Sequence, residues 1–390
     1  MSAERPSILV LSHLFPNSVH PYLGLFVARQ VRALQETYDI RVVAPTRWVP
    51  PATHSWRSER KLTKVEVVDG TTVHRPRAPQ LPFGGMAVET LALPVFLRGV
   101  VRSLDRERKL DLIHAHYGLP DGWTAAKLSR ELRLPLVLTL WGSDALVLPN
   151  RVALRRLLSQ ALRRATHVIA PSRAIADRAL ELGADADRTS VLMGGVPDDY
   201  ANMSRTDARA ALSLPPNMRL IVWVGNFVPE KQPLLALRAI SLVAQRCSDV
   251  RLVLIGDGHM LPAVRRTARN LHCEDCISLL GSLDTADVAT WQAAADLVLN
   301  TSRSEGLPFS LSEALVSGTR VAAVPVGGIP ELLAVTSGGT LAVDSSPEAV
   351  AEAIHHELQL APDEDLSRRS AFLLLSNVIP RLADIYTRSL

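Results

Sequence analysis

The chain has 390 residues, of which 47% are hydrophobic and 21% are charged, and its formal net charge is +4. This length favours two domains over a single core. No stretch approaches the roughly 18 uninterrupted apolar residues of a membrane-spanning helix. The N-terminus also lacks a signal-peptide pattern, so we expect neither feature.

The three cysteines, Cys247, Cys273 and Cys276, do not form a disulfide framework, which predicts a reducing, cytoplasmic location. Cys273 and Cys276 make an isolated CxxC pair without a second ligand pair. Because structural zinc prefers four ligands, we interpret them as structural thiols and expect no metal site.

The positive charge is concentrated in the first half of the chain. Residues 1–200 carry 27 Lys and Arg against 19 Asp and Glu, whereas the remainder carries 16 against 20. Arginines are dense in two helix-like stretches, 96–109 and 151–164. This asymmetry predicts either solvated helix faces or an anionic partner, such as acidic membrane lipid or a phosphorylated acceptor. Nucleic acid is disfavoured, because aromatic residues are only 5% and no recognised binding motif occurs.

Short apolar runs alternate with longer helical patterns in the first half, which predicts a parallel sheet covered by helices. Residues 48–61 are rich in Pro, Ser and charge, which predicts a long loop. The expected strands are 7–12, 40–44, 112–115, 136–140 and 167–170, with helices over 23–37 and 174–182.

The same alternation restarts after a polar, Pro-rich stretch. The expected strands of this half are 220–224, 250–255, 277–280, 297–300 and 320–324. The predicted fold is therefore α/β, with two doubly wound domains whose cleft is the expected ligand site. We expect an N-terminal domain over 1–196, a linker over 197–217, a second domain over 218–369 and a C-terminal helix over 370–390 that packs on either domain.

Residues 300–314 are the segment richest in chemistry, because they follow one predicted strand and open a helix. Gly306 permits a tight turn, and Pro308 suits a first helical turn, where its missing N–H costs little. The N–H groups of that turn suit an anion or sugar hydroxyls. Glu305 and Glu313 are spaced to grip a polyol at two points, although a capped helix with solvent-facing acids fits these residues equally well.

Three further strand ends carry polar or glycine-rich turns. Lys231 follows the strand that ends at Gly225 and offers a point charge to phosphate, although a surface lysine is the simpler interpretation. The turn Gly256-Asp257-Gly258 fits a backbone wall around a base or ribose. Residues 326–331 form another glycine turn that leads into a helix.

The order of these segments resembles glycosyltransferase family 4, which has the GT-B architecture of two facing Rossmann-like domains. Glu305 to Glu313 matches the E-x7-E motif of that family. The resemblance also includes the segments at 111–117, 120–122, 139–144 and 168–172, the strand with Gly225 and Lys231, and the turns at 256–258 and 326–331. It covers almost the whole chain.

The resemblance implies site residues for a nucleotide-sugar donor. Lys231 would contact the diphosphate, Glu313 the ribose hydroxyls and Glu305 the transferred sugar, which makes Lys231 and Glu305 the expected catalytic residues. Further donor contacts are expected from Gly24, Asn226, Gly256, Gly258, Gly306, Leu307, Pro308 and Phe309. The implied reaction is retaining and needs no bound metal or cofactor, and a UDP- or GDP-sugar serves as co-substrate.

The sequence departs from the family pattern at three places. Asn226 stands where Arg is common, and Trp141 replaces the His that commonly contacts the donor sugar. Gly194-Gly195-Val196 replaces the usual Asn-Gly-Val. An amide supplies hydrogen bonds without charge, and an indole ring can stack on a sugar.

Four residues of the first half are candidates for the acceptor or sugar side. His13 follows the first strand, and His116 ends a later one. A structural role, shared with His114, is the alternative for His116. Asp144 either orients the turn that carries Trp141 or contacts the acceptor.

The predicted function is a hexosyl-transferring glycosyltransferase of polysaccharide or glycolipid biosynthesis, with a glycan or lipid-linked acceptor. We expect it to be cytoplasmic, with peripheral association at the anionic inner face of the cell membrane. The alternative is a nucleotide-sugar-binding subunit that supports a partner enzyme without catalysis.

Overall fold

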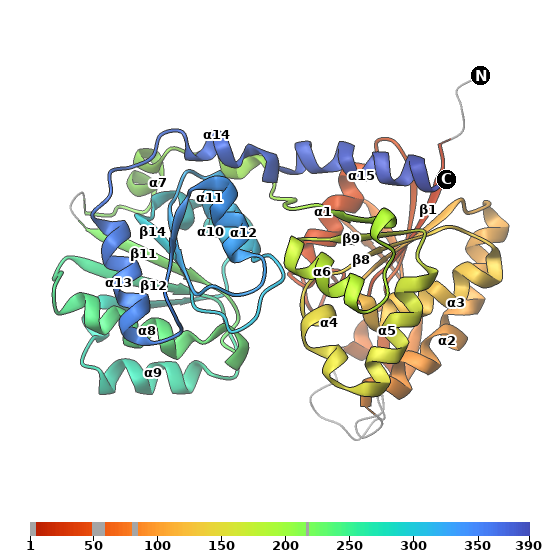
Figure 1. The fold of residues 1–390 in the computed structure, drawn as a ribbon, viewed down its shortest axis with the longest axis horizontal. Helices are drawn as coiled ribbons and strands as arrows, with labels where there is room; N and C mark the ends of the chain where they lie inside the picture. The colour runs from red at the N-terminus through yellow and green to blue at the C-terminus, as the bar shows by residue number, and fades with distance from the viewer. Residues whose placement is uncertain (1–4, 49–58, 80–84, 216–217) are drawn as a thin grey trace. The chain divides into compact units, whose positions relative to one another are not determined.

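The computed structural model describes residues 5–48, 59–79, 85–215 and 218–390. The chain divides into two units, the first made of residues 1–195 and 378–390 and the second of residues 196–377. Both units consist of a mainly parallel sheet covered by helices (Figure 1). The predicted α/β fold of two Rossmann-like domains is therefore confirmed.

The first unit contains an eight-stranded sheet in the order β10-β9-β8-β7-β1-β2-β5-β4, in which β4 alone pairs antiparallel. A separate parallel pair joins β3 to β6. The strands of this unit are β1 (Ser7–Leu11), β2 (Asp39–Val43), β3 (Thr46–Trp48), β4 (Val65–Val68), β5 (Thr71–His74), β6 (Arg77–Pro79), β7 (Leu112–His116), β8 (Leu136–Thr139), β9 (His167–Ala170) and β10 (Thr189–Val191). Its helices are α1 (Leu25–Leu34), α2 (Gly85–Glu107), α3 (Trp123–Leu132), α4 (Ser143–Leu146), α5 (Val152–Arg164) and α6 (Arg173–Glu181), with a π-helical turn η3 (Gly118–Gly122).

Alternating side chains of the central strand β1 supply the two cores of the first unit. Leu9 and Leu11 belong to a cluster that also contains buried residues of α2, α3, α5 and α6. Ile8 and Val10 belong to the opposite cluster, with buried residues of α1 and the C-terminal helix α15 (Leu375–Ser389). A strand with apolar residues on both faces reads as a continuous hydrophobic run, which explains why β1 was predictable from the sequence.

The second unit contains a six-stranded parallel sheet in the order β13-β12-β11-β14-β15-β16. Helices α8, α9 and α13 pack in the core on one face, while α10, α11 and α14 associate on the other (Figure 1). Its strands are β11 (Arg219–Val224), β12 (Val250–Ile255), β13 (Ile277–Gly281), β14 (Leu297–Asn300), β15 (Val321–Ala323) and β16 (Gly339–Leu341). Its helices are α7 (Arg205–Ala211), α8 (Pro233–Ala244), α9 (Leu261–Asn270), α10 (Thr285–Ala294), α11 (Phe309–Val316), α12 (Ile329–Thr336), α13 (Pro347–Leu358) and α14 (Leu366–Ser370).

Several segments differ from expectation in detail. The last helix begins at Leu375 instead of near residue 370, because Leu374 adopts an extended conformation after a 3-10 turn. The residues expected to form a linker, 197–217, carry a 3-10 turn (Asp198–Ala201) and α7, as far as they are described. Of the predicted loop between Trp48 and Lys61, residues 49–58 lie outside the described residues, and 59–61 form a 3-10 turn.

Candidate functional site

The strand order of the second unit fixes where a ligand can approach its sheet. Numbered along the chain, the six strands run 3-2-1-4-5-6, so the direction of winding changes between β11 and β14. In open α/β sheets, ligands bind beyond the carboxyl ends of the strands at such a switch point. Lys231 follows β11, and Glu305 follows β14.

Lys231 and Glu305 form an ion pair at this point, with Nζ and Oε1 2.5 Å apart. The lysine side chain keeps 32% of its surface exposed, whereas the carboxylate keeps 10%. Thus a partly accessible cation is held by an almost buried acid, although 74 residues separate them in the sequence. Two residues that the sequence predicted independently are brought together.

Thr301 braces the two loops that carry this pair. Its hydroxyl lies 3.0 Å from the carbonyl oxygens of both Lys231 and Gln232, to which it donates. The same oxygen accepts a 3.0 Å hydrogen bond from the indole Nε1 of Trp223 on β11. Because Thr301 and Trp223 are almost completely buried, these bonds are shielded from water. Sequence reasoning assigned no role to either side chain.

Backbone contacts at glycine positions bring neighbouring loops together. Gly327 has φ of +55°, and a Cβ there would lie 1.7 Å from the carbonyl oxygen of Glu305. Gly256 has φ of +137°, and a Cβ there would lie 2.0 Å from the carbonyl oxygen of Gly225. Only glycine permits both this backbone conformation and this approach, so the loops after β11, β12, β14 and β15 converge at one edge.

The other predicted donor residues of the second unit, apart from Glu313, lie in the loops at the same edge of the sheet. Asn226 is exposed in a tight turn after β11, where its carbonyl oxygen accepts from the Val228 N–H at 2.9 Å. Gly258 lies in the turn after β12. Gly306 and Leu307 precede Pro308, which caps α11, and Phe309 is the first residue of that helix.

Glu313 lies within α11 and is buried. The positive end of the α11 dipole is directed toward the segment 306–309, which favours an anion there. The second unit thus combines Lys231, Glu305 and a helix N-terminus at one sheet edge, with Glu313 farther along that helix.

The first unit has its own switch point, between β1 and β7. His13 follows β1, and Asp121 lies in the η3 turn that follows β7. The backbone N–H of His13 donates to both Asp121 oxygens at 3.1 and 3.2 Å, and the imidazole Nδ1 bonds to the same carboxylate. Burial lowers the pKa of His13, but the charge and hydrogen bond of Asp121 outweigh it, so the pKa is raised overall. Asp121 therefore favours the protonated form of His13, whose side chain keeps 30% of its surface exposed.

Asp144 organises the turn that carries Trp141. Its fully buried carboxylate accepts hydrogen bonds from the backbone N–H groups of Gly118, Trp141, Gly142 and Ala145, at 2.8 to 3.2 Å. Burial raises its pKa, against the lowering effect of these four donors. Asp144 therefore orients the turn and has no exposed surface for an acceptor.

The Trp141 ring packs against two other rings of the first unit. Its ring centroid lies 4.3 Å from that of Phe26 and 5.9 Å from that of His116. His116 is buried, and burial lowers its pKa to about 3, so its ring is neutral. His114 bonds through Nδ1 to the Tyr386 hydroxyl at 2.6 Å and through Nε2 to Thr139 at 2.8 Å. His114 is therefore structural, and it anchors α15 to the sheet.

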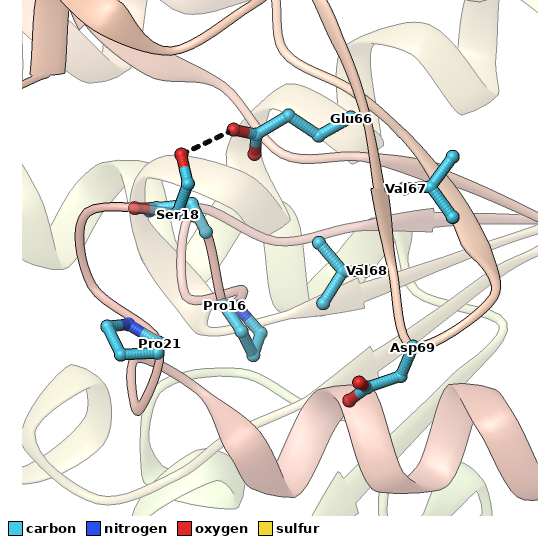
Figure 2. Close-up of a pocket in the computed structure, with 8 residues that line it drawn as sticks. Pro16, Ser18, Pro21, Glu66, Val67, Val68 and Asp69 are labelled. Atoms are coloured by element: carbon cyan, nitrogen blue, oxygen red, sulfur yellow. Dashed lines mark hydrogen bonds between the residues drawn. The ribbon is translucent and has the colours of Figure 1, made fainter.

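Gly24 precedes α1 with φ of +66°, in the loop that continues from His13. A cavity of about 380 Å³ borders the early part of this loop and is shown in Figure 2. Pro16, Ser18 and Pro21 line one side, and the β4–β5 hairpin lines the other. Ser18 donates a 2.9 Å hydrogen bond to Glu66 across the cavity, so apolar rings and carboxylates both face it.

The cysteines are free thiols. Cys273 and Cys276 are buried, and burial raises the pKa of Cys273 to about 12, which keeps it protonated and inert. Within the described ranges, no three His, Cys, Asp or Glu side chains are grouped to hold a metal ion. A search of the described helices also found none that is both long and apolar enough to cross a membrane.

Comparison with known proteins gives the family. Residues 23–195 match the model of the glycosyl transferase 4-like domain, and residues 218–359 match that of glycosyl transferases group 1. A putative teichuronic acid biosynthesis glycosyltransferase, TuaC of Bacillus subtilis, is 30% identical over 359 residues, which are 89% of this chain and 88% of that protein. The chain belongs to glycosyltransferase family 4.

Solved structures agree with the GT-B fold of this glycosyltransferase. Sucrose-phosphate synthase from Thermosynechococcus elongatus superposes with a TM-score of 0.80 at 18% identity, over 99% of both chains. Anabaena HepE, solved in complex with UDP-glucose, superposes with a TM-score of 0.73 at 21% identity, over 98% of this chain and 99% of its own. The resemblance drawn from the sequence is confirmed at the level of family, fold and enzyme class.

Proposed function

We propose that this glycosyltransferase takes a hexose from a nucleoside-diphosphate sugar and transfers it, with retention of configuration, to a growing cell-surface polysaccharide or glycolipid. The observation that carries the proposal is the Lys231–Glu305 pair at the switch point of the second unit. A cation and an acid in contact are suited to a ligand with a diphosphate beside a polyol.

The donor would lie along the carboxyl ends of β11, β12 and β14. Lys231 and the N–H groups at the start of α11 would face the diphosphate, and Glu305 would accept hydrogen bonds from the sugar. Glu313, farther along α11, would hold the ribose hydroxyls. The nearly buried Glu305 is well suited to this role, because a desolvated carboxylate binds hydroxyl donors more strongly than an exposed one.

The chemistry requires charge stabilisation more than a protein base. The bond between the anomeric carbon and the diphosphate oxygen breaks, and negative charge accumulates on the diphosphate. Lys231 and the backbone N–H groups stabilise that charge in the transition state. The acceptor oxygen attacks from the face that the diphosphate leaves, and its proton passes to the departing phosphate.

The nucleotide proposed first is UDP. HepE, which shares the fold, was solved with UDP, with UDP and glucose, and with UDP-glucose. The polysaccharide acceptor is supported by TuaC, the relative named for teichuronic acid biosynthesis. Acceptor contacts would come from the first unit, where His13 presents a partly exposed imidazole at the switch point and Trp141 presents an aromatic ring. A cytoplasmic enzyme at the inner membrane face would meet both substrates.

A transfer assay tests the proposal. Purified enzyme is incubated with radiolabelled UDP-glucose, UDP-galactose, UDP-N-acetylglucosamine or GDP-mannose and a membrane extract, and the anomeric configuration of the product is determined. We expect transfer from one donor with retention. Transfer from none of them, by enzyme shown to be folded, would contradict the proposal.

Glu305→Gln separates catalysis from nucleotide binding. The amide keeps the shape of the side chain but loses the charge, and it releases Lys231 from its ion pair. We therefore expect UDP to bind at least as tightly as to the wild type, while transfer falls by about 100-fold or more. If UDP binding and transfer fell together, Glu305 would be a structural residue. A wild type that binds UDP without transfer would favour the non-catalytic subunit instead.

A further inference from the structure

A second groove lies in the first unit, away from the turns described above. It has a volume of about 470 Å³ and runs between α5 and the end of α6. From α5, polar side chains line it at Arg155, Arg156, Ser159, Gln160 and Arg163. Its other wall is the short segment 181–183.

The sequence of α5 places its arginines on the groove side. The buried residues of this helix are Leu154, Leu157, Leu158, Ala161 and Leu162, which recur at helical spacing and join the core. The arginines that line the groove occupy the exposed face. They contribute nothing to the core, so their charges are available to a ligand.

Several other cations of this unit pair with neighbouring acids. Arg98 and Arg102 on α2 both pair with Glu131, and Lys109 pairs with Asp105 at 2.8 Å. These pairs explain part of the basic character of residues 96–109 as ordinary surface ion pairs.

The arginines of the groove lack such neutralisation. Among the described residues, Glu181 is the one carboxylate that lines the groove, and Arg178 engages it at 2.5 Å. Across the described part of the chain, neither Arg155, Arg156 nor Arg163 has a carboxylate within 4.0 Å. Three positive charges thus line one wall of a concave surface, which lowers the free energy of an anion there.

We propose that this groove binds an acidic glycan, a sugar chain carrying carboxylate or phosphate groups, as an extension of the acceptor. The α-helical rise places Arg155 and Arg163 about 12 Å apart along the helix, so they match charges on separate sugars of one chain. Ser159 and Gln160 lie between them and can bond to sugar hydroxyls. Guanidinium groups bind carboxylate and phosphate through two parallel hydrogen bonds, so the contact is directional as well as electrostatic.

An anionic bilayer is the other common source of clustered negative charge. The concavity of the site favours a chain over a bilayer, because a planar surface reaches the rim of a groove before its floor. The inference rests on the proposed function, since the glycan would be the acceptor of the transfer reaction. Its test must therefore include a readout that is independent of transfer.

The test removes the three charges together in Arg155→Gln/Arg156→Gln/Arg163→Gln. Binding of a fluorescently labelled galacturonic acid hexamer is measured at low salt, with a neutral maltohexaose as reference. The wild type should bind the acidic hexamer, more weakly as salt rises, and bind the neutral one much less. Each exposed arginine contributes a factor of a few, so the variant should bind the acidic hexamer about tenfold or more weakly.

The matched control carries the same loss of charge on the second unit. Arg265, Arg266 and Arg269 are exposed on α9 and line none of the described cavities reported above. Their triple Gln variant should bind the hexamer as the wild type does. If both variants lost the same affinity for the acidic hexamer, the loss would be explained by the change in net charge, and the proposal would be overturned.

Two further binding measurements, with lipid vesicles and with UDP, separate glycan binding from membrane binding and the groove proposal from the proposed function. Vesicles of 70% phosphatidylcholine and 30% phosphatidylglycerol should bind the wild type and the groove variant alike. If only vesicle binding depended on the groove arginines, the glycan proposal would be overturned in favour of a membrane contact. UDP binding by calorimetry should be unchanged in the groove variant. Failure of the wild type to bind UDP would count against the proposed function, whereas failure to bind the hexamer would count against the groove alone.

Discussion

Replacement of Thr301 by valine tests whether the second unit is preorganised around Lys231. Valine has nearly the shape of threonine but lacks the hydroxyl, which joins the Trp223 indole to the carbonyls of Lys231 and Gln232. An unsatisfied buried polar group costs about 1–3 kcal/mol. The valine variant affects the Trp223 indole most, because the ring has a single N–H donor and cannot rotate to direct it at another acceptor.

For a domain of this size, 1 kcal/mol shifts the melting temperature by about 2–4 °C, so Thr301→Val should lower it by roughly 2–12 °C. The same change should weaken UDP binding, because the loop that carries Lys231 loses its attachment to β14. Thr301→Ser is the matched control, since it keeps the hydroxyl and removes only a methyl group. It should lower the melting temperature less than the valine variant.

Calorimetric unfolding and UDP titration of the three proteins decide the matter. If Thr301→Val melted at the wild-type temperature and bound UDP equally well, the hydroxyl would not brace the site. If the serine variant were as damaged as the valine variant, the methyl group and its packing would be responsible instead of the hydrogen bonds.

Three further predictions concern other parts of the two units. Gly327→Ala should displace the Glu305 backbone, because the new Cβ would lie 1.7 Å from the Glu305 carbonyl oxygen. Transfer activity should then fall by about tenfold or more, while the circular dichroism spectrum should remain that of the folded wild type. Asp121→Asn should lower the pKa of His13 below 6.5, since burial would then dominate; NMR titration measures it, and an unchanged pKa would contradict the assignment. In the wild type, protonated His13 bonded to Asp121 stabilises the folded state fully below pH 6.5, and this stabilisation is lost as the pH rises through the raised pKa of His13. Thermal unfolding measured across pH 6–9 should show this loss only when Asp121 is present. Asp144→Asn replaces an acceptor oxygen by a donor amid four backbone N–H groups and should destabilise the protein by about 2–4 kcal/mol in denaturant unfolding; a change under about 0.5 kcal/mol would be inconsistent with the hydrogen bonds described.

The sequence predicted the central strands of both sheets because they are buried on both faces. β1 and β12 read as largely apolar runs, although β1 begins with Ser7 and β12 contains Arg251. The structure starts and ends both strands within about one residue of expectation. Among the edge strands of the two described sheets, β13 was predicted, but β4, β10 and β16 were not. β10 and β16 have three residues each, and β4 alternates exposed and half-buried residues at a sheet edge. The Asp69-Gly70 turn between β4 and β5 was the available signal for that hairpin.

The candidate site shows a similar limit. Lys231, Glu305 and Glu313 were predicted because they occupy recognisable positions at strand ends and in a family motif. The contact between Lys231 and Glu305 joins residues 74 positions apart, and the contact between His13 and Asp121 joins residues 108 positions apart. Neither local propensity nor periodicity carries information about pairs at such separation. The buried hydroxyl of Thr301 was likewise visible only after the strands had been placed in order.

The account depends most on a nucleotide donor bound beside Lys231, and titration calorimetry with UDP and GDP tests this directly. In Lys231→Gln a charged hydrogen bond to phosphate is lost and the Glu305 charge is left beside the ligand, so affinity should fall by about 10- to 100-fold. Arg238→Gln, which removes an exposed cation from the following helix α8, should bind as tightly as the wild type. Wild-type affinity in Lys231→Gln, or an equal loss in both variants, would contradict the placement of the donor.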